Sequence, residues 1–180
     1  MSGTRRVRPG MSGEALALTR FPAVRGRSLL GSDLALPGDL PAERTLVVVA
    51  FQRWQQARVE RWIERAVEAG IPPTPRGRTG PLAVAVVEMP VLASAWRPVR
   101  RFIDGGMTAG IGDPDVLART ITVYTDVAAF QRSLGIRGSA EVHALVVTRD
   151  GAVLARGSGD PDAGSWAAIA SALAGGRRPT

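Results

Sequence analysis

The residues that could do chemistry lie in a short polar elbow, residues 52–56, between an apolar run and an amphipathic pattern. Ligands of open α/β sheets gather beyond the carboxyl ends of the strands, where such elbows lie. This elbow, QRWQQ, contains only glutamine, arginine and tryptophan. None of these is a nucleophile, a carboxylic acid or a common metal ligand, so we expect no catalytic residue, no cofactor and no metal ion.

Residue types that the chain lacks exclude several reaction classes. The 180 residues contain no cysteine, which rules out disulfides, thiolate nucleophiles and thiolate metal sites. His143 is the one histidine, so neither a zinc site nor histidine-based catalysis is favoured. Asp113 and Asp115 flank Pro114, and this spacing fits the capped start of a helix better than a divalent cation site.

The charge of the chain is strongly basic, with a formal net charge of +7 and no lysine. Part of the excess lies in the tails, where Arg5, Arg6 and Arg8 stand near one end and Arg177 and Arg178 near the other. A basic balance can attract nucleic acid or anionic lipid. Aromatic residues interleave with arginine only near two tryptophans, however, so we do not favour nucleic acid as the partner.

The sequence carries no pattern of a membrane protein. No apolar run approaches the roughly 20 residues that span a bilayer. The apolar patch at residues 15–18 is shorter than the core of a signal peptide, which needs about 7–15 residues. We therefore expect a cytoplasmic protein without a membrane span, and the sequence leaves open whether it is a monomer or a homodimer.

The elements that position the elbow alternate along the chain. The length fits one domain over residues 21–174, with a disordered basic tail at 1–20 and a flexible tail at 175–180. Apolar runs predict a central mixed sheet of four to five strands, flanked by helices, at residues 45–51, 82–89, 121–125, 142–148 and 152–156. Residues 28–30 and 34–36 predict a small N-terminal hairpin. Helices are expected near residues 55–69, 96–104, 127–134 and 165–174, and a short one is expected to start at Pro114, with Asp126 as the cap of the helix at 127–134.

The order of these elements resembles the thioredoxin-like superfamily. Residues 46–59 look like the thioredoxin strand and active-site elbow, with Trp54 in the place of the family's tryptophan. Residues 134–153, LGIRGSAEVHALVVTRDGAV, look like the stretch that leads into the last hairpin. The early hairpin and the insert after residue 89 are more similar to the peroxiredoxin and alkyl hydroperoxide reductase branch. The opening at residues 21–36 also resembles bacterial relatives of the mitochondrial ATP synthase assembly factors.

This resemblance implies an α/β, thioredoxin-like fold without the family's redox chemistry. Gln55 and Arg58 stand where the C-x-x-C motif has its cysteines, and the elbow has no peroxidatic cysteine. His143 lies near the place of the family's cis-proline. Thiol–disulfide exchange needs an attacking thiolate, so we expect neither thiol-disulfide oxidoreductase nor peroxidase activity.

The leading hypothesis is a non-catalytic binding or assembly module that holds a protein partner on the emptied active-site face. Tryptophan and arginine are the residue types most enriched in interface hot spots. The candidate contact residues are Arg53, Trp54, Gln55, Arg58, Glu141 and His143. One alternative is a cysteine-independent enzyme or a binder of an anionic small molecule in the same cleft. Another is a basic protein associated with nucleic acid.

Overall fold

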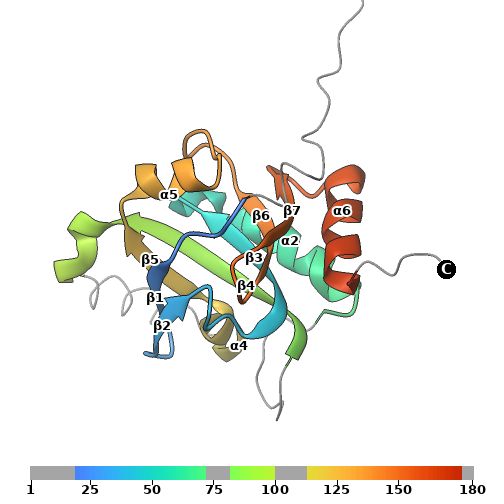
Figure 1. Cartoon of the computed structure of the whole chain (residues 1–180), viewed down its shortest axis with the longest axis horizontal. Helices are drawn as coiled ribbons and strands as arrows, with labels where there is room; N and C mark the ends of the chain where they lie inside the picture. Colours follow the sequence, from blue (N-terminus) through green and yellow to red (C-terminus); the bar gives the residue numbers. More distant parts are fainter. Residues whose placement is uncertain (1–18, 72–81, 100–112, 176–180) are drawn as a thin grey trace, which may run out of the picture.

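The computed structural model describes residues 19–71, 82–99 and 113–175. Seven strands form one mixed sheet in the order β2-β1-β5-β4-β3-β6-β7 (Figure 1). The strands are β1 (Val24–Ser28), β2 (Asp33–Leu36), β3 (Ala42–Ala50), β4 (Leu82–Ala93), β5 (Ile121–Thr125), β6 (His143–Thr148) and β7 (Val153–Ser158). The helices are α2 (Gln56–Glu68), α4 (Pro114–Arg119), α5 (Val127–Ser133) and α6 (Ala163–Ala174), with 3-10 turns η1 (Arg53–Gln55) and η2 (Ser94–Val99).

The prediction of four to five strands was wrong because the N-terminal hairpin is part of the sheet. β1 pairs antiparallel with β5, and Gly26 lies opposite Val123. Glycine permits this close approach, since a Cβ atom at position 26 would lie 2.7 Å from Cγ2 of Ile121. The hairpin strands also differ from the predicted ones: β1 ends at Ser28, whose N–H donates to the carbonyl of Ser32 at 2.9 Å.

The centre of the sheet has the expected mixed character. β3 pairs parallel with β4 and antiparallel with β6, and β4 pairs parallel with β5. The five predicted central strands correspond to β3 through β7, with ends displaced by a few residues. β3 lies between β4 and β6 in the interior of the sheet. The elbow follows its carboxyl end and therefore does not lie beside an edge strand.

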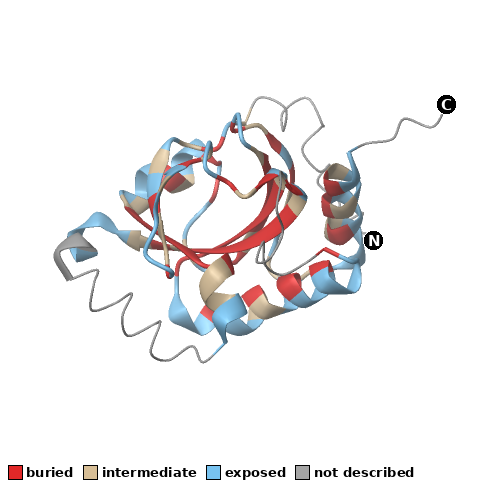
Figure 2. Ribbon diagram, turned by 90° about the horizontal axis from the view of Figure 1, so that it is seen from below, coloured by how far each residue is buried: buried red, intermediate tan, exposed pale blue. Residues whose placement is uncertain are grey.

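Helices cover both faces of the sheet and create two cores (Figure 2). Leu46 and Val48 pack with the inner side of α2 and α6, including Trp62 and Ile169. Val47 and Val49 point to the other face, where Phe130 of α5 packs. All four of these β3 residues are fully buried, which explains why the strand shows no apolar–polar alternation.

α2 is the amphipathic helix that the sequence predicts. Val59, Trp62, Ile63 and Ala66 form its buried stripe, whereas the apolar residue Val67 is 46% exposed. The helix ends before Gly70, whose φ of +80° is the left-handed conformation that glycine adopts without strain. No helix in the described ranges is long and apolar enough to cross a membrane.

Several expected features fall partly outside the described residues. The predicted helix at 96–104 begins as η2, and residues 100–104 lie outside the described part of the chain, as do most of both predicted tails. Thr19 and Arg20 belong to the N-terminal tail that the sequence predicts, but the structure describes both. Thr19 is bound to the fold, because Val153 N–H donates to its carbonyl at 3.2 Å.

The predicted caps of α4 and α5 are confirmed, because Asp113 and Asp126 accept hydrogen bonds from helix N–H groups.

Candidate functional site

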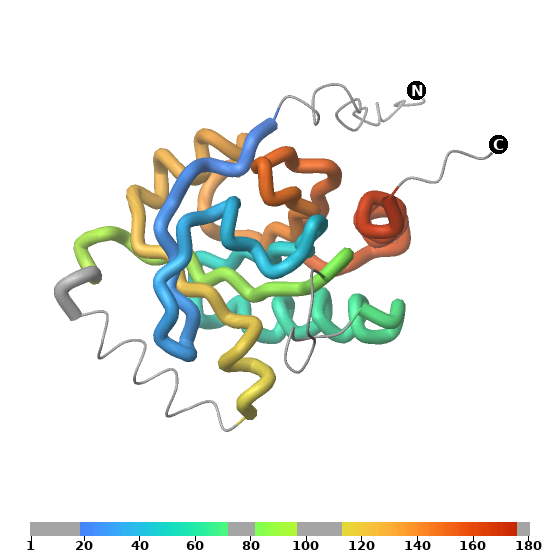
Figure 3. The backbone as a smooth tube through the Cα atoms, turned by 60° about the horizontal axis from the view of Figure 1, so that its bottom comes forward, coloured from blue at the N-terminus to red at the C-terminus, as the bar shows by residue number. Residues whose placement is uncertain are grey.

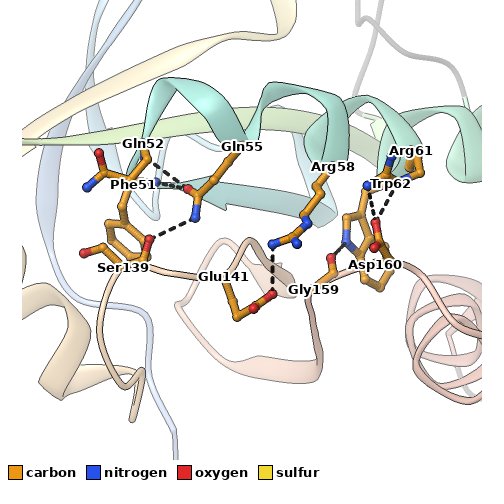
Figure 4. A network of polar contacts seen from close by, with 10 residues as sticks. All are labelled: Phe51, Gln52, Gln55, Arg58, Arg61, Trp62, Ser139, Glu141, Gly159 and Asp160. Atoms are coloured by element: carbon orange, nitrogen blue, oxygen red, sulfur yellow. Dashed lines mark hydrogen bonds and ion pairs between the residues drawn. The ribbon is translucent and has the colours of Figure 1, made fainter.

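The elbow after β3 is held in place by Gln55, which lies within η1 (Figure 4). Its Oε1 accepts hydrogen bonds from the N–H groups of Phe51 at 2.8 Å and Gln52 at 3.1 Å. Its Nε2 donates to the carbonyl of Ser139 at 2.9 Å, in the loop that precedes β6. Gln55 is fully buried, so it cannot contact a partner, and its place among the predicted contact residues is corrected. Its role is to connect the elbow to the neighbouring loop.

One side of α2 continues these connections along the helix (Figure 4). Arg58 Nη1 lies 3.3 Å from Oε2 of Glu141 in the same loop before β6. One turn further, Trp62 Nε1 donates to the carbonyl of Gly159 at 2.9 Å, in the loop after β7. Positions 55, 58 and 62 lie on one side of the chain because side chains three or four residues apart share a helix face. Two loops distant in sequence therefore lie beside the elbow.

Four of the six predicted contact residues form a group at the surface, which we name the elbow surface: Arg53, Trp54 and Glu141, which are exposed, and Arg58, which is half-buried. Trp54 is 63% exposed, and the Arg58 guanidinium lies 5.7 Å from its ring centroid, within cation–π range. Arg53 is exposed beside them. Arg58 thus contacts both the exposed indole ring and Glu141, which lies 83 residues away in the sequence.

His143 does not belong to the elbow surface, contrary to the prediction. It is the first residue of β6, and its ring packs edge-on against Phe51, with centroids 6.3 Å apart. Burial lowers the pKa of His143, and the charge of Arg156 lowers it further, while Glu141 acts in the opposite direction. A half-buried, neutral imidazole that packs on an aromatic core residue has a structural role.

Sequence reasoning missed a buried polar cluster beneath the start of α2. Glu88 lies within the apolar run of β4, is only 4% exposed, and its Oε2 has no hydrogen-bond partner among the described residues. Burial raises the pKa of Glu88, whereas the Gln56 amide and the Arg119 guanidinium lower it and Glu60 raises it. Arg119 is also buried, and its Nη2 lies 3.4 Å from Oε2 of Glu60. A single glutamate inside a strand-like sequence carries no signal of this environment.

Glu88→Gln should stabilise the protein at neutral pH. Because the folded-state pKa of Glu88 is raised, the native state binds the proton more tightly than the unfolded state, so stability falls as pH rises through the window above the ordinary value of 4.5. Glutamine keeps the shape without the charge, and we expect a gain on the order of 1 kcal/mol at pH 7 that vanishes near pH 4.

Urea unfolding of both proteins between pH 4 and pH 8 measures this difference. Glu64→Gln, on the exposed side of α2, is the control and should leave the pH profile unchanged. A variant Glu88→Gln that is less stable at pH 7 would show that the attraction between Glu88 and Arg119 outweighs the cost of burial.

Two hollows on the described part of the molecule lie away from the elbow surface, one of about 480 Å³ between α2 and α4 and one of about 430 Å³ between β7 and α6. Glu88 is buried and is not among the residues that line either hollow. An exposed tryptophan beside two arginines suits a macromolecular partner, because small substrates bind in concave sites with few charges.

Comparisons with known proteins place the fold. The sequence matches no protein-family model and no curated protein. Among solved structures, a thioredoxin, the exposed lipoprotein Etrx1 of Streptococcus pneumoniae, aligns with 84% of this chain and 99% of its own, at 11% identity and a TM-score of 0.51. The fold is thioredoxin-like.

A second solved structure has the same fold. An uncharacterised conserved protein from Geobacillus kaustophilus aligns with 89% of this chain and 83% of its own, at 15% identity and a TM-score of 0.53. At sequence identities as low as these, the structural similarity shows the fold alone. The thioredoxin-like arrangement expected from residues 46–59 and 134–153 is therefore confirmed, with seven strands in the sheet.

Proposed function

We propose that this protein is a non-catalytic binding module whose elbow surface holds a protein partner. The observation that carries the proposal is Trp54, a large aromatic side chain that is 63% exposed at the carboxyl end of the central strand. The Arg58 guanidinium lies 5.7 Å from the centroid of its ring. Exposed tryptophan beside arginine is the composition of interface hot spots.

The surroundings of Trp54 support a binding role because side-chain contacts tie them to the rest of the fold. Gln55 and Arg58 connect the elbow to the loop before β6, and Trp62 connects α2 to the loop after β7. A preorganised surface binds with a smaller loss of conformational entropy than one that must order on contact. Arg53 has no ion-pair partner among the described residues, so the partner should present a carboxylate to it.

The proposal excludes the redox chemistry of thioredoxin-like proteins. The whole chain has no cysteine, and neither Gln55 nor Arg58 can form the thiolate that disulfide exchange requires. An assembly role for the partner interaction, and a place in the peroxiredoxin branch or beside the ATP synthase assembly factors, remain hypotheses from the sequence, because the structural neighbours support only the fold.

Trp54→Ala should weaken partner binding by about 1–3 kcal/mol, the usual effect of truncating a hot-spot side chain. The test is affinity capture from native extract with the full chain, followed by titration of whichever protein is retained. Trp96→Ala is the matched control, since Trp96 is also a surface tryptophan, 55% exposed, but belongs to η2. It should bind as the unaltered chain does.

Two outcomes would contradict the proposal. Equal losses for Trp54→Ala and Trp96→Ala would show nonspecific attraction to exposed indole rings. The second is capture of nucleic acid that is lost after nuclease treatment and at high salt. That result would point to the basic charge of the chain instead, because phosphate contacts weaken steeply with salt.

A further inference from the structure

Most arginines whose side chains the structure describes are paired within the fold. Six form ion pairs with carboxylates, namely Arg20, Arg27, Arg58, Arg61, Arg65 and Arg119. Arg149 and Arg156 donate to main-chain carbonyls. Five have neither an ion pair nor a hydrogen bond among the described residues: Arg25, Arg44, Arg53, Arg132 and Arg137. The last three of these lie around the elbow, and all three are exposed.

Two hydrogen bonds bring these three arginines to one place. Gln55 Nε2 donates to the Ser139 carbonyl at 2.9 Å, and Gln131 Nε2 donates to the Ser139 hydroxyl at 2.9 Å. An unpaired arginine stands two residues before the first glutamine, one residue after the second, and two residues before the serine. Two residues span at most about 7 Å of backbone, so the three arginines lie close to one junction of three chain segments.

The junction joins elements from the two faces of the sheet. Figure 3 shows α2 and α5 on opposite sides of the central strands, in agreement with the separate cores in which they pack. The loop before β6 contacts both, because Ser139 bonds to Gln55 on one side and to Gln131 of α5 on the other. The unpaired arginines of both elements therefore gather at the carboxyl end of β3, where Trp54 is exposed.

The charge at this junction is strongly positive. The segments that form it, residues 52–58 and 131–141, contain four arginines and one glutamate as their charged residues. The glutamate, Glu141, is already paired with Arg58. Like charges that stand close together repel one another, and an anionic ligand that binds among them removes part of that repulsion. The junction is thus suited to a ligand that brings its own negative charges.

The surroundings favour carboxylates on a protein segment over phosphates on a nucleic acid. A guanidinium group binds a carboxylate through two parallel N–H donors. Trp54 offers an apolar surface beside the arginines, on which an apolar or aromatic side chain of the same segment can pack. It is the one aromatic ring of the elbow surface, whereas proteins that hold single-stranded nucleic acid stack successive bases on several rings.

We propose that the elbow surface, together with Arg132 and Arg137, binds an acidic segment of a protein partner. The carboxylates of that segment pair with the unpaired arginines, and an apolar side chain packs on Trp54. This inference rests on the proposed function and adds to it the chemical class of the partner. It accounts for the gathering of unpaired arginines at the elbow, whereas Arg61 and Arg65 further along α2 have carboxylate partners.

A library of short random peptides displayed on phage, selected on the immobilised full chain in about 0.15 M salt, tests the class of partner. A parallel selection on Trp54→Ala identifies the peptides that depend on the elbow surface. We expect these to contain more aspartate and glutamate than lysine and arginine, together with a large apolar residue. Neutral or basic Trp54-dependent peptides, or none at all, would overturn the inference, whereas the proposed function is judged separately by capture from native extract.

Arg137→Glu measures the contribution of the unpaired charge to the affinity of the most enriched peptide, by fluorescence anisotropy. Arg25→Glu is the matched control, because Arg25 is also exposed and unpaired but belongs to β1. Charge reversal at position 137 should weaken binding about fivefold or more, and reversal at position 25 by less than about twofold. Equal losses would show attraction to the net charge of the chain and would overturn the inference.

A single-stranded DNA oligonucleotide is the competing probe in the same assay. We expect it to displace the selected peptide less well than the unlabelled peptide does, because the junction is matched to carboxylates and an apolar side chain. Displacement at equal or lower concentration would overturn the inference and assign the junction to nucleic acid, whose phosphate contacts weaken steeply with salt.

Discussion

Trp62→Ala should lower the free energy of unfolding by about 3–5 kcal/mol, the largest effect expected of a single substitution in this protein. Trp62 is fully buried in the core between α2 and the sheet. Its ring fills the space that Gly157 leaves free, so alanine would leave a cavity that neither β7 nor α2 can close. The substitution also removes the hydrogen bond from Nε1 to the Gly159 carbonyl.

Chemical denaturation measures this loss, with Trp54→Ala as the matched control. Both residues are tryptophans on either side of the first turn of α2, but Trp54 is 63% exposed and Trp62 is fully buried. Trp54→Ala should change the unfolding free energy by less than about 0.5 kcal/mol. Comparable losses in the two variants would mean that Trp54 also serves the fold, and the elbow surface would lose its main support as a binding site.

Gln55→Ala should cost about 2–4 kcal/mol of stability, the second-largest effect. The substitution leaves the Phe51 N–H and the Ser139 carbonyl without the partner that each has now, and each unsatisfied buried group costs about 1–3 kcal/mol. Water can reach part of the elbow, because Ser139 is only half-buried, which keeps the expected loss below the sum for two fully buried groups.

Chemical denaturation measures the unfolding free energy of Gln55→Ala, with Arg53→Ala as the control. The control shows whether any substitution in the elbow lowers stability or only the loss of Gln55 does. Arg53 belongs to the same 3-10 turn and is exposed, so its removal should be nearly neutral in stability. Gln55→Ala should also weaken partner binding, since it loosens the loop that carries Glu141. A stable Gln55→Ala variant would refute the view that this glutamine holds the elbow together.

The alternation of buried strands with capped helices could be predicted from local patterns, and the resemblance of their order implied the thioredoxin-like fold. The unbroken apolar run of β3 requires cover on both faces, and the stripe of Val59, Trp62 and Ile63 provides it on one. The caps Asp113 and Asp126 and the glycine after α2 mark helix ends through backbone chemistry that acts over three or four residues. The lack of cysteine is a property of the sequence and excludes thiol chemistry without any structure.

The number of strands and the membership of the site were decided only by tertiary structure. β1 joins the sheet through pairing with β5, about a hundred residues away, and no local pattern encodes that partner. Gln55 and Trp54 are adjacent polar-elbow residues in the sequence, yet one is fully buried and the other exposed. The reason is that the loop before β6 approaches the elbow from one side only, and Ser139 meets the residue that faces it. Burial depends on residues from elsewhere in the chain, and for Glu88 in β4 it likewise raises the pKa of a carboxyl group that the sequence presents as ordinary.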